Sequence, residues 1–542
     1  MGKLPILQFS WAMSASRRLL STVSPASAAA VPAAVESSSA VLAEEEEEGM
    51  QEKKNRERGK HLYRRLSELG GAPEGAVSRT LDKWVREGRP VSAMDLIKHV
   101  KGLRKYRRYE HALEVMDWMV NIKGVKISYG DHAIRLYLIA KVKGVKSAED
   151  YFTNLPESAK NQLTYGALLS CYCSEKMEDD AVTLYEKMKE LKLVSGTLVH
   201  NHLMTLYTKL GQPEKVPTIL EEMKANNVAP DNVTYCILMN SYASLNDIES
   251  VERVINQLED TGEVLPHWSS YSTLASIYNS AGLFEKSESA LKKLEQLIDG
   301  SDKEPFHFLV SLYAGAGNLQ EVHRVWKSLK ATFTKQTNIG YLIMLQALNK
   351  LDDIDGLKTC YEEWESVFTF YDARLTNFAI GAHLRHGMVE EAESLVRKAK
   401  EKGGAYDFRT CDMFMDYYLK NNEIAAALNW LEAAVQIAKK AEWKLDDEKA
   451  EMFMKYYGKG KCVDGAEKFC KALEGLGSLG AGAYESLLRT YVASGRRGGP
   501  SLRELSEKID LRLARAKMRY NELAGSGQTH TRNPSLPLWI HP

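Results

Sequence analysis

The sequence predicts an all-α fold, a solenoid of about eleven helix-turn-helix units, and three observations lead to this prediction. Similar segments recur with a period near 35 residues, so that Asn201 and Cys236 occupy the same place in successive copies (236 − 201). Each copy carries two apolar stripes with helical spacing. The chain has 542 residues, too long for one hydrophobic core but ordinary for an array that adds core unit by unit.

The unit from Thr197 to Asp231 illustrates the pattern. Its first helix has an apolar stripe at spacings of three and four, formed by Val199, Leu203, Leu206 and Tyr207. Its second helix has another stripe, formed by Val216, Ile219, Leu220 and Met223. Gly211 ends the first helix, and Pro213 fits the first position of the second, where its missing N–H is not needed. Pro217 falls inside the second helix and predicts a local kink.

The same reading along the chain places the tandem repeats over residues 93–500. The predicted units begin at Ala93, Tyr129, Gln162, Thr197, Asn232, Trp268, Lys303, Asn338, Ala373, Phe408 and Asp447, with a partial unit from Ala481. A solenoid needs an atypical end with a polar outer face. We therefore predict capping helices at residues 61–92, buried through Leu81, Trp84 and Val85, and a C-terminal capping helix at residues 501–523.

The N-terminal segment has the composition of an organelle transit peptide. Residues 1–35 contain Lys3, Arg17 and Arg18, many Ser and Ala residues, and no acidic residue. Arginine shortly before Ser21 favours a mitochondrial destination, with the chloroplast and a plain basic tail as alternatives. Residues 36–60 contain the acidic run Glu44–Glu48 and are predicted to be a disordered charged linker, and residues 524–542 a disordered tail.

Composition excludes several classes of protein. With 44% hydrophobic and 27% charged residues, the chain has a globular composition. No apolar run approaches the roughly 18 residues that span a bilayer, so no membrane insertion is expected. The 72 basic and 72 acidic residues give a net charge of +0. Because phosphate binding requires excess Lys and Arg, any RNA surface must be a local positive face.

Enzyme, metal and cofactor signatures are absent from the sequence. His200 and His202 lie on different helical faces, and no phosphate-cradling glycine loop or zinc-deaminase signature is found. The seven cysteines lack C-x-x-C spacing and mostly fall on apolar faces, so buried thiols are expected at Cys171, Cys173, Cys236, Cys360, Cys411, Cys462 and Cys470. We predict a protein that is not an enzyme, with no metal, cofactor or small-molecule substrate.

The recurring motif resembles the pentatricopeptide repeat family. It reads T-Y-x-x-L-(L/M)-x-x-Y, then G-x-x-(E/D)-(E/K)-A, an aromatic or leucine, a methionine, and V-x-P-D, as at Thr164–Leu169, Met177–Ala181 and Leu184–Met188. The tetratricopeptide series W-x2-L-G-x2-Y is not found. The resemblance implies a right-handed superhelix, and the N-terminal segments are similar to a plant subgroup of short, repeat-only organellar members.

In this family, each unit can present one RNA base to two side chains, the fifth residue of the unit and the last. The second residues of that unit and the next sandwich the base. Carried over, the unit at Thr197 gives Asn201 and Asp231, sandwiched by Leu198 and Val233. An Asn/Asp pair implies a pyrimidine, preferably uridine.

Two further units match this pattern with departures. The unit at Ala373 gives Asn377 and Asp407, but its sandwich positions are Arg374 and Arg409. The unit at Trp268 gives Ser272 and Asp302, a purine-type pair, with Glu304 at one flank. The remaining fifth positions do not fit a code, and they are Ile97, Ala133, Gly166, Cys236, His307, Leu342, Asp412 and Glu451. Asp412 and Glu451 are expected to repel phosphate.

Helix capping explains the same aspartates. Asp231, Asp302 and Asp407 immediately precede predicted helices, where Asp binds exposed backbone N–H groups. Both interpretations stay open at this stage. Asn201 is harder to explain by capping, because it falls in mid-helix and Asn is a poor helix former.

Two hypotheses about function follow. The first is an RNA-binding protein of mitochondria that holds single-stranded organellar RNA and acts in its processing, stability, splicing or translation, with phosphate contacts from a basic stretch between Lys98 and Arg108. The second is a non-catalytic scaffold, for example a plant-specific component of the mitochondrial ribosome, which binds protein or structured rRNA without reading bases. The neutral charge and the degraded fifth positions fit the second.

Overall fold

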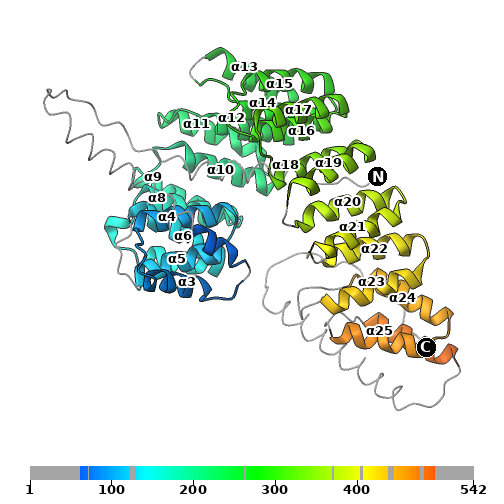
Figure 1. Ribbon diagram of the computed structural model, residues 1–542. Coiled ribbons are helices and arrows are strands. Elements are labelled where there is room, and N and C mark those ends of the chain that lie inside the picture. Colours follow the sequence, from blue (N-terminus) through cyan, green and yellow to red (C-terminus); the bar gives the residue numbers. More distant parts are fainter. Residues whose placement is uncertain are drawn as a thin grey trace, which may run out of the picture. The chain divides into compact units, whose positions relative to one another are not determined.

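The computed structural model describes residues 62–494, with gaps at 71, 122–127, 262–263, 369–370, 403, 405–406, 438–444 and 476–480. Within this part of the chain the regular structure is entirely helical (Figure 1). Four predictions lie outside the described residues: the transit peptide, the charged linker, the C-terminal capping helix and the disordered tail.

The helices follow one another as short elements of similar length (Figure 1). A capping helix, α3 (Ala76–Arg86), precedes eleven helix pairs and a last helix. The pairs are α4 (Ala93–Lys105) and α5 (Tyr109–Asn121), α6 (Tyr129–Lys143) and α7 (Val145–Thr153), α8 (Gln162–Ser174) and α9 (Glu178–Glu190), α10 (Thr197–Leu210) and α11 (Val216–Ala225), α12 (Asn232–Ser244) and α13 (Ile248–Thr261), α14 (Trp268–Ser280) and α15 (Phe284–Gln296), α16 (Glu304–Gly315) and α17 (Leu319–Thr332), α18 (Asn338–Lys350) and α19 (Ile354–Val367), α20 (Ala373–Arg385) and α21 (Val389–Glu401), α22 (Phe408–Lys420) and α23 (Ile424–Ile437), α24 (Asp447–Lys459) and α25 (Val463–Gly475), with α26 (Ala481–Ala493) last.

The predicted helix starts agree with the structure in every unit but one. The first helix of that unit, α16, begins at Glu304 instead of Lys303, and Pro305 lies in its first turn. The kink predicted at Pro217 is wrong. A short 3₁₀ helix, η2 (Pro213–Lys215), precedes α11, and Pro217 therefore falls in the first turn of α11, where no helical hydrogen bond is lost.

A left-handed residue closes the first helix of nearly every pair. In α10 this residue is Gly211, with φ 74°, and the next N–H, that of Gln212, donates to the Tyr207 carbonyl at 2.9 Å. This six-to-one bond is a Schellman C-cap, and it satisfies a carbonyl that the helix end leaves open. The same positive φ recurs at Arg107, Lys176, Asn246, Gly282, Gly317, Asp352, Gly387, Asn422 and Lys461. The backbone conformation of the turn between the two helices therefore ends the first helix at the same place in these units.

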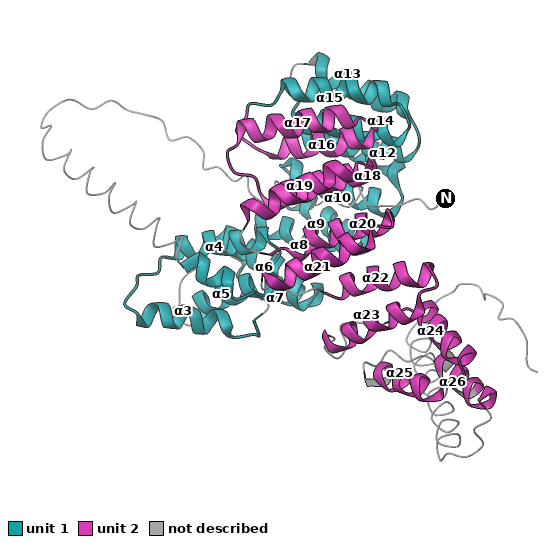
Figure 2. Cartoon of the chain, turned by 45° about the vertical axis from the view of Figure 1, so that its right-hand side comes forward, with its two compact units in different colours: residues 1–299 teal, residues 300–542 magenta. Residues whose placement is uncertain are grey.

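The chain forms two compact units, residues 1–299 and 300–542 (Figure 2). In each unit, first helices of successive pairs pack against one another, as α8, α10, α12 and α14 do in unit 1 and α16, α18, α20 and α22 in unit 2. We call these helices the first-helix layer and their partners the second-helix layer. The predicted stripes are buried, including Leu203 and Leu206 on α10 and Val216 and Met223 on α11. A continuous core in each unit fixes the spacing of the first-helix layer.

The Gly211 turn predicts a pair of substitutions with opposite effects. Gly211→Ala should lower the free energy of unfolding by about 1 kcal/mol, because an L-residue is strained at φ 74° although nothing lies within 4 Å of the added Cβ. Gly166→Ala, in mid-α8 and also without a neighbour within 4 Å, should raise it by about 1 kcal/mol through helix propensity. Urea unfolding followed by circular dichroism measures both. Equal effects of the two substitutions would contradict the assigned turn.

Candidate nucleic-acid interface

The predicted pair Asn201 and Asp231 forms a hydrogen-bonded network with a third residue, Thr234. Asn201 Nδ2 donates to Asp231 Oδ1 at 3.2 Å, and Thr234 Oγ1 lies 2.9 Å from Asn201 Oδ1. Asp231 Oδ1 also accepts the Thr234 backbone N–H at 2.8 Å. Thr197 Oγ1 donates to the other carboxylate oxygen at 2.9 Å. Because both amide ends are assigned partners, the orientation of the Asn201 side chain is fixed.

The second predicted pair repeats this arrangement in unit 2. Asn377 Nδ2 donates to Asp407 Oδ1 at 2.9 Å, and Thr410 Oγ1 lies 2.6 Å from Asn377 Oδ1. Here the unit begins with Ala373, which has no hydroxyl group, so the bond that Thr197 supplies in the first network has no counterpart. Asp407 is exposed, whereas Asn201 and Asn377 are only 1% and 4% exposed.

Helix capping is confirmed for Asp231 and Asp407, and base recognition by the same residues stays a prediction. Asp231 and Asp407 are N-caps of α12 and α22, each in a capping box with a threonine three residues on. The same Oδ1 atom that caps the helix accepts the asparagine amide of the preceding unit. The network therefore links two successive repeats through one carboxylate. Thr234 and Thr410 were not among the predicted site residues, although an Asp followed three residues later by a Thr is a pattern that predicts such a capping box.

The second positions form a partly exposed apolar column in unit 1. Leu198 and Val233 are half-buried beside the Asn201 network, and Leu163, one unit earlier, is exposed. Arg374 and Arg409, the corresponding residues beside Asn377, are both exposed. The side chains that the resemblance assigns to base stacking thus have surface available.

The third predicted pair is divided between the two units. Ser272, in unit 1, is buried and donates to the Ser269 carbonyl at 2.9 Å. Asp302, in unit 2, precedes the N-cap residue Lys303 and accepts the N–H of Glu304, the first residue of α16, at 3.1 Å. Each residue has a local structural role. The expected repulsion at Asp412 is reduced, because Lys449 forms an ion pair with it and another, at 2.8 Å, with Asp416.

Acidic residues are segregated between the two helix layers. From α8 to α20, the first helices contain one acidic residue, Glu304. Each second helix from α9 to α21 contains one to five. This separation is a property of the sequence that becomes visible once the helices are sorted by layer. The first helices from α8 to α20 are therefore nearly free of side chains that would repel an anion.

Cations recur near the ends of the first helices. They lie twelve residues after the helix start, as Lys209 does after Thr197 (209 − 197). We name this set the first-helix cations, and it comprises Lys105, Lys141, Lys209, Lys350, Arg385, Lys420 and Lys459. All are exposed, and only Lys141, 3.0 Å from Glu175, has an acidic partner among the described residues. A cation near a helix C-terminus also interacts favourably with the helix dipole.

A row of lysines in the second-helix layer is neutralised by its neighbours. We call Lys189, Lys286, Lys293 and Lys330 the paired lysines. Each forms an ion pair, at 2.5–2.8 Å, with a glutamate of a neighbouring second helix. Lys189 and Lys330 contact the next second helix, at Glu222 and Glu363. Lys286 and Lys293 contact the preceding one, at Glu252 and Glu259. Apart from Lys141, the first-helix cations thus differ from the paired lysines in having no acidic partner among the described residues.

The surroundings of Lys209 affect the protonation of its ammonium group. The pKa of its ammonium group is lowered by burial, which disfavours the charged form in the absence of a carboxylate partner. Lys209 lines a small pocket together with Tyr137, Ser170 and His202. Burial lowers the pKa of the His202 imidazole to about 4. Lys350 also has a pKa lowered by burial.

The basic stretch predicted from Lys98 to Arg108 is only partly free. Lys98 lies 3.7 Å from Asp95, and the Arg104 guanidinium lies 5.9 Å from the centre of the Tyr137 ring. Arg108 donates to the Ser67 carbonyl and so ties the first repeat to the N-terminal cap. Lys101 and Lys105 have no acidic partner among the described residues.

The described residues were also examined for metal sites, membrane-spanning helices and reactive thiols. They contain no group of three His, Cys, Asp or Glu side chains placed to hold a metal ion. No described helix is long and apolar enough to cross a membrane. Six of the seven cysteines are buried as predicted, and Cys462 is exposed. Burial raises the pKa values of Cys171 and Cys173 to about 12, so these thiols stay protonated.

The fold and this surface define an α-helical repeat protein, and comparisons with known proteins identify its family. The PPR repeat family model matches residues 196–244, and the PPR repeat model matches residues 163–193, 233–262 and 377–404. A mitochondrial pentatricopeptide repeat-containing protein of Arabidopsis thaliana is 40% identical over 80% of this chain and 86% of its own length. The chain therefore belongs to the pentatricopeptide repeat family.

One further relative and one solved structure are also similar to this chain. The large ribosomal subunit protein mL101 (rPPR4) of Arabidopsis thaliana is 41% identical over 84% of this chain and 94% of its own length. The structure of the pentatricopeptide repeat protein PPR10 in complex with an 18-nt psaJ RNA element is 19% identical, with a TM-score of 0.44 over 74% of this chain and 58% of that chain. The family is one of non-catalytic RNA-binding proteins, in agreement with the prediction that this protein is not an enzyme.

The shared carboxylate predicts unequal effects of two cap substitutions. Asp231→Ala should lower stability by about 2 kcal/mol, because α12 loses its cap and the buried Asn201 amide loses an acceptor. Asp302→Ala, which removes a cap bond at an exposed position, should cost about 0.5 kcal/mol. Thermal unfolding of the two variants beside the parent protein provides the comparison. Equal losses would show that the link to Asn201 contributes nothing.

Proposed function

We propose that this protein binds single-stranded organellar RNA along its first-helix layer, in mitochondria, and so acts in the processing, stability, splicing or translation of a transcript. The observation that carries the proposal is the segregation of charge. Acidic residues are nearly absent from first helices α8–α20, and the first-helix cations almost all lack acidic partners among the described residues. A polyanion neutralises such cations, and each of the two units contains several of them.

Base recognition is the second element of the proposal. A helical repeat of this family can present one base to two side chains. Asn201 with Asp231, and Asn377 with Asp407, offer an amide held in one orientation beside a carboxylate, which suits the edge of a pyrimidine. Leu198 and Val233 would cover the faces of the base at the first pair. Since both asparagines are nearly buried, base binding requires a small outward movement of their side chains.

The mitochondrial assignment is supported from two directions. Residues 1–35 have the basic, acid-free composition of a transit peptide. Several similar proteins of Arabidopsis thaliana are mitochondrial by name. We place the protein in the mitochondrion on these grounds, rather than in the chloroplast.

A second candidate function is attachment to the mitochondrial ribosome. It is favoured by the 41% identity to a large ribosomal subunit protein, which extends over 94% of that protein. It also fits the fifth positions that cannot read a base, such as Ile97, Ala133 and Leu342. Under this candidate, the first-helix cations would contact phosphates of structured rRNA without base selection.

The charge row predicts a specific change in salt dependence. Replacing Lys209, Lys350 and Arg385 together by glutamine should weaken binding to oligouridylate and make the plot of log affinity against log salt less steep by about 2, since each cation releases about 0.7 counterion from a single strand. Fluorescence anisotropy at several salt concentrations gives the slope. The matched control replaces the paired lysines Lys189, Lys286 and Lys330 by glutamine, which should leave the slope unchanged. Equal slopes in the two triple variants would contradict the proposed surface.

Sedimentation separates the two candidates. Mitochondrial extract from plants is centrifuged through a sucrose gradient with and without prior dissociation of ribosomal subunits. A transcript-binding protein should sediment away from the large subunit. Recovery of most of the protein with the large subunit, even at high salt, would favour the ribosomal candidate and count against the first proposal.

A further inference from the structure

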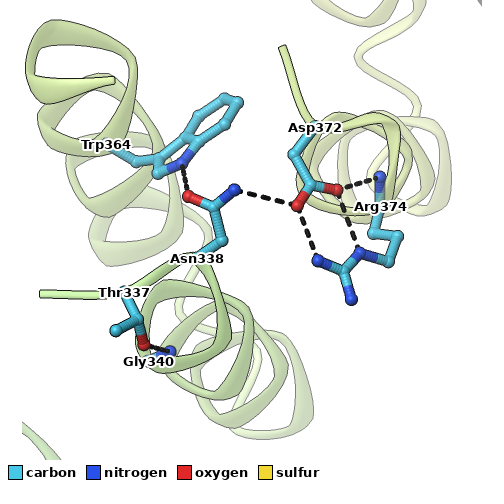
Figure 3. Close-up of polar contacts among 6 residues, drawn as sticks. All are labelled: Thr337, Asn338, Gly340, Trp364, Asp372 and Arg374. Atoms are coloured by element: carbon cyan, nitrogen blue, oxygen red, sulfur yellow. Dashed lines mark hydrogen bonds and ion pairs between the residues drawn. The ribbon is translucent and has the colours of Figure 1, made fainter. Parts of the chain in front are cut away.

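One buried histidine of the first-helix layer differs from the polar networks around it. In such networks the polar groups satisfy one another, and Figure 3 shows one in which Asn338 accepts the Trp364 indole N–H at 3.0 Å and donates to Asp372 at 2.9 Å. Asp372 in turn accepts a bond from Arg374 at 2.7 Å. His202, on α10, is only 8% exposed, and its Nε2 atom has no hydrogen-bond partner among the described residues. Because buried polar atoms are normally bonded, this nitrogen marks a place where a ligand group can bind.

His202 lines a small cavity that spans three successive first helices. Tyr137 on α6, Ser170 on α8 and Thr205 on α10 also line it. Each of these three is the ninth residue of its helix (137 − 129, 170 − 162 and 205 − 197), so the cavity follows the stacking of the repeats. Its volume is about 60 Å³, against the roughly 150 Å³ of a cavity that holds one benzene ring. The cavity therefore accepts a hydroxyl-sized group but not a nucleobase.

The lining residues are polar, with one cation, Lys209, and no carboxylate. Burial, and to a lesser extent the charge of Lys209, lower the pKa of His202 to about 4, so its imidazole is neutral and offers one donor and one acceptor. Thr205 Oγ1 donates to the Asn201 carbonyl at 2.7 Å, and its oxygen can still accept a bond. Cys173, another lining residue, stays a thiol because burial raises its pKa to about 12. This set suits a neutral group that both donates and accepts, which describes a hydroxyl group.

The unit that provides Ser170 lacks both side chains with which a unit of this family reads a base. Its fifth residue is Gly166 and its last is Gly196. Nothing lies within 4 Å of a Cβ added at Gly166, so no neighbouring side chain occupies that position instead. A nucleotide opposite the unit at Gln162 therefore meets no side chain at the two base-reading positions. Its ribose and its phosphate are the groups left to contact.

We propose that this cavity binds the ribose 2′-hydroxyl of the nucleotide opposite the unit at Gln162, through His202, Ser170 and Thr205. Lys209, which is exposed, contacts the adjacent phosphate. In RNA the 2′-hydroxyl and the 3′-phosphate are on neighbouring carbons of one ribose, which matches a hydroxyl-binding cavity with a cation beside it. The inference rests on the proposed RNA-binding function and adds to it a selection for RNA over DNA, because the 2′-hydroxyl distinguishes the two.

The test compares RNA with DNA of the same base sequence. The full-length protein and its His202→Leu and His202→Gln variants are titrated with oligouridylate and with oligodeoxyuridylate of equal length, and fluorescence anisotropy gives the affinities. Leucine removes the polar edge of the imidazole and stays apolar in a buried place, whereas glutamine keeps a donor and an acceptor. We expect His202→Leu to weaken RNA binding about fivefold and to leave DNA binding unchanged. His202→Gln should stay within about twofold of the parent protein for both.

Three further variants locate the effect. Ser170→Ala is a smaller change at the same cavity and should lower the preference for RNA over DNA about two- to threefold. Lys209→Gln should weaken RNA and DNA binding by the same factor, because both carry the phosphate. The matched control is His200→Leu, since His200 is also buried on α10 with an unpartnered Nε2 but packs against Tyr185 of α9, with ring centres 5.9 Å apart. It should leave the preference unchanged, and circular dichroism confirms that each variant is folded.

The outcomes separate the hydroxyl site from the proposed function. If the parent protein binds no oligouridylate and no mitochondrial RNA, the proposed function fails. If it binds RNA, but His202→Leu and Ser170→Ala keep the parent preference for RNA over DNA, the hydroxyl site is refuted while RNA binding stands. Equal losses of RNA and DNA binding in a folded His202→Leu variant would also overturn it, because they would show a purely structural role.

Discussion

One carboxylate oxygen links each of two pairs of neighbouring repeats, and the proposed surface depends on this bond. Oδ1 of Asp231 caps α12 and at the same time accepts the Asn201 amide of α10. A side-chain acceptor is favoured at this position, because it satisfies a backbone N–H that the helix start leaves open. Because the cap already fixes the carboxylate, it can hold an asparagine of the preceding helix in one orientation. A structural necessity thus supplies a pre-organised polar site, and Asp407 supplies a second one in unit 2. At Asp372 the same position serves a different purpose, since its partner is Arg374.

Acidic residues are distributed unequally between the two helix layers, a property that the net charge of the whole chain does not show. The paired lysines of the second-helix layer are neutralised by glutamates of neighbouring helices. Such exposed pairs add little stability, but they neutralise these four lysines of the second-helix layer. Burial of Lys209 and Lys350, two of the first-helix cations, lowers the pKa of each ammonium group. A chain with 72 basic and 72 acidic residues can therefore still carry cations without acidic partners on the described first helices of each unit.

The sequence was sufficient for the fold because each unit repeats the same local signals. Apolar spacing, the left-handed turn after most first helices and the polar residue before most of them agree, and the helix starts could be predicted with one exception at Glu304. The Asn–Asp pairs could be predicted from the family resemblance alone. Thr234 and the network of Asp372 with Asn338 could not, because they depend on contacts between side chains some 33 or 34 residues apart. The layer charge was present in the sequence, but it is visible only after the helices are assigned to layers. The kink predicted at Pro217 was wrong because a 3₁₀ helix precedes α11, so that α11 begins at Val216 and Pro217 lies in its first turn.

The most direct test of this account is ultraviolet crosslinking of the protein in isolated mitochondria, followed by sequencing of the bound RNA. The parent protein is compared with an Asn201→Ala/Asn377→Ala double variant whose stability is measured in parallel. The account predicts crosslinks concentrated at a pyrimidine-containing site of a messenger or intron, and their loss in the double variant. Crosslinks confined to ribosomal RNA and unchanged in the double variant would contradict base recognition by the Asn–Asp pairs.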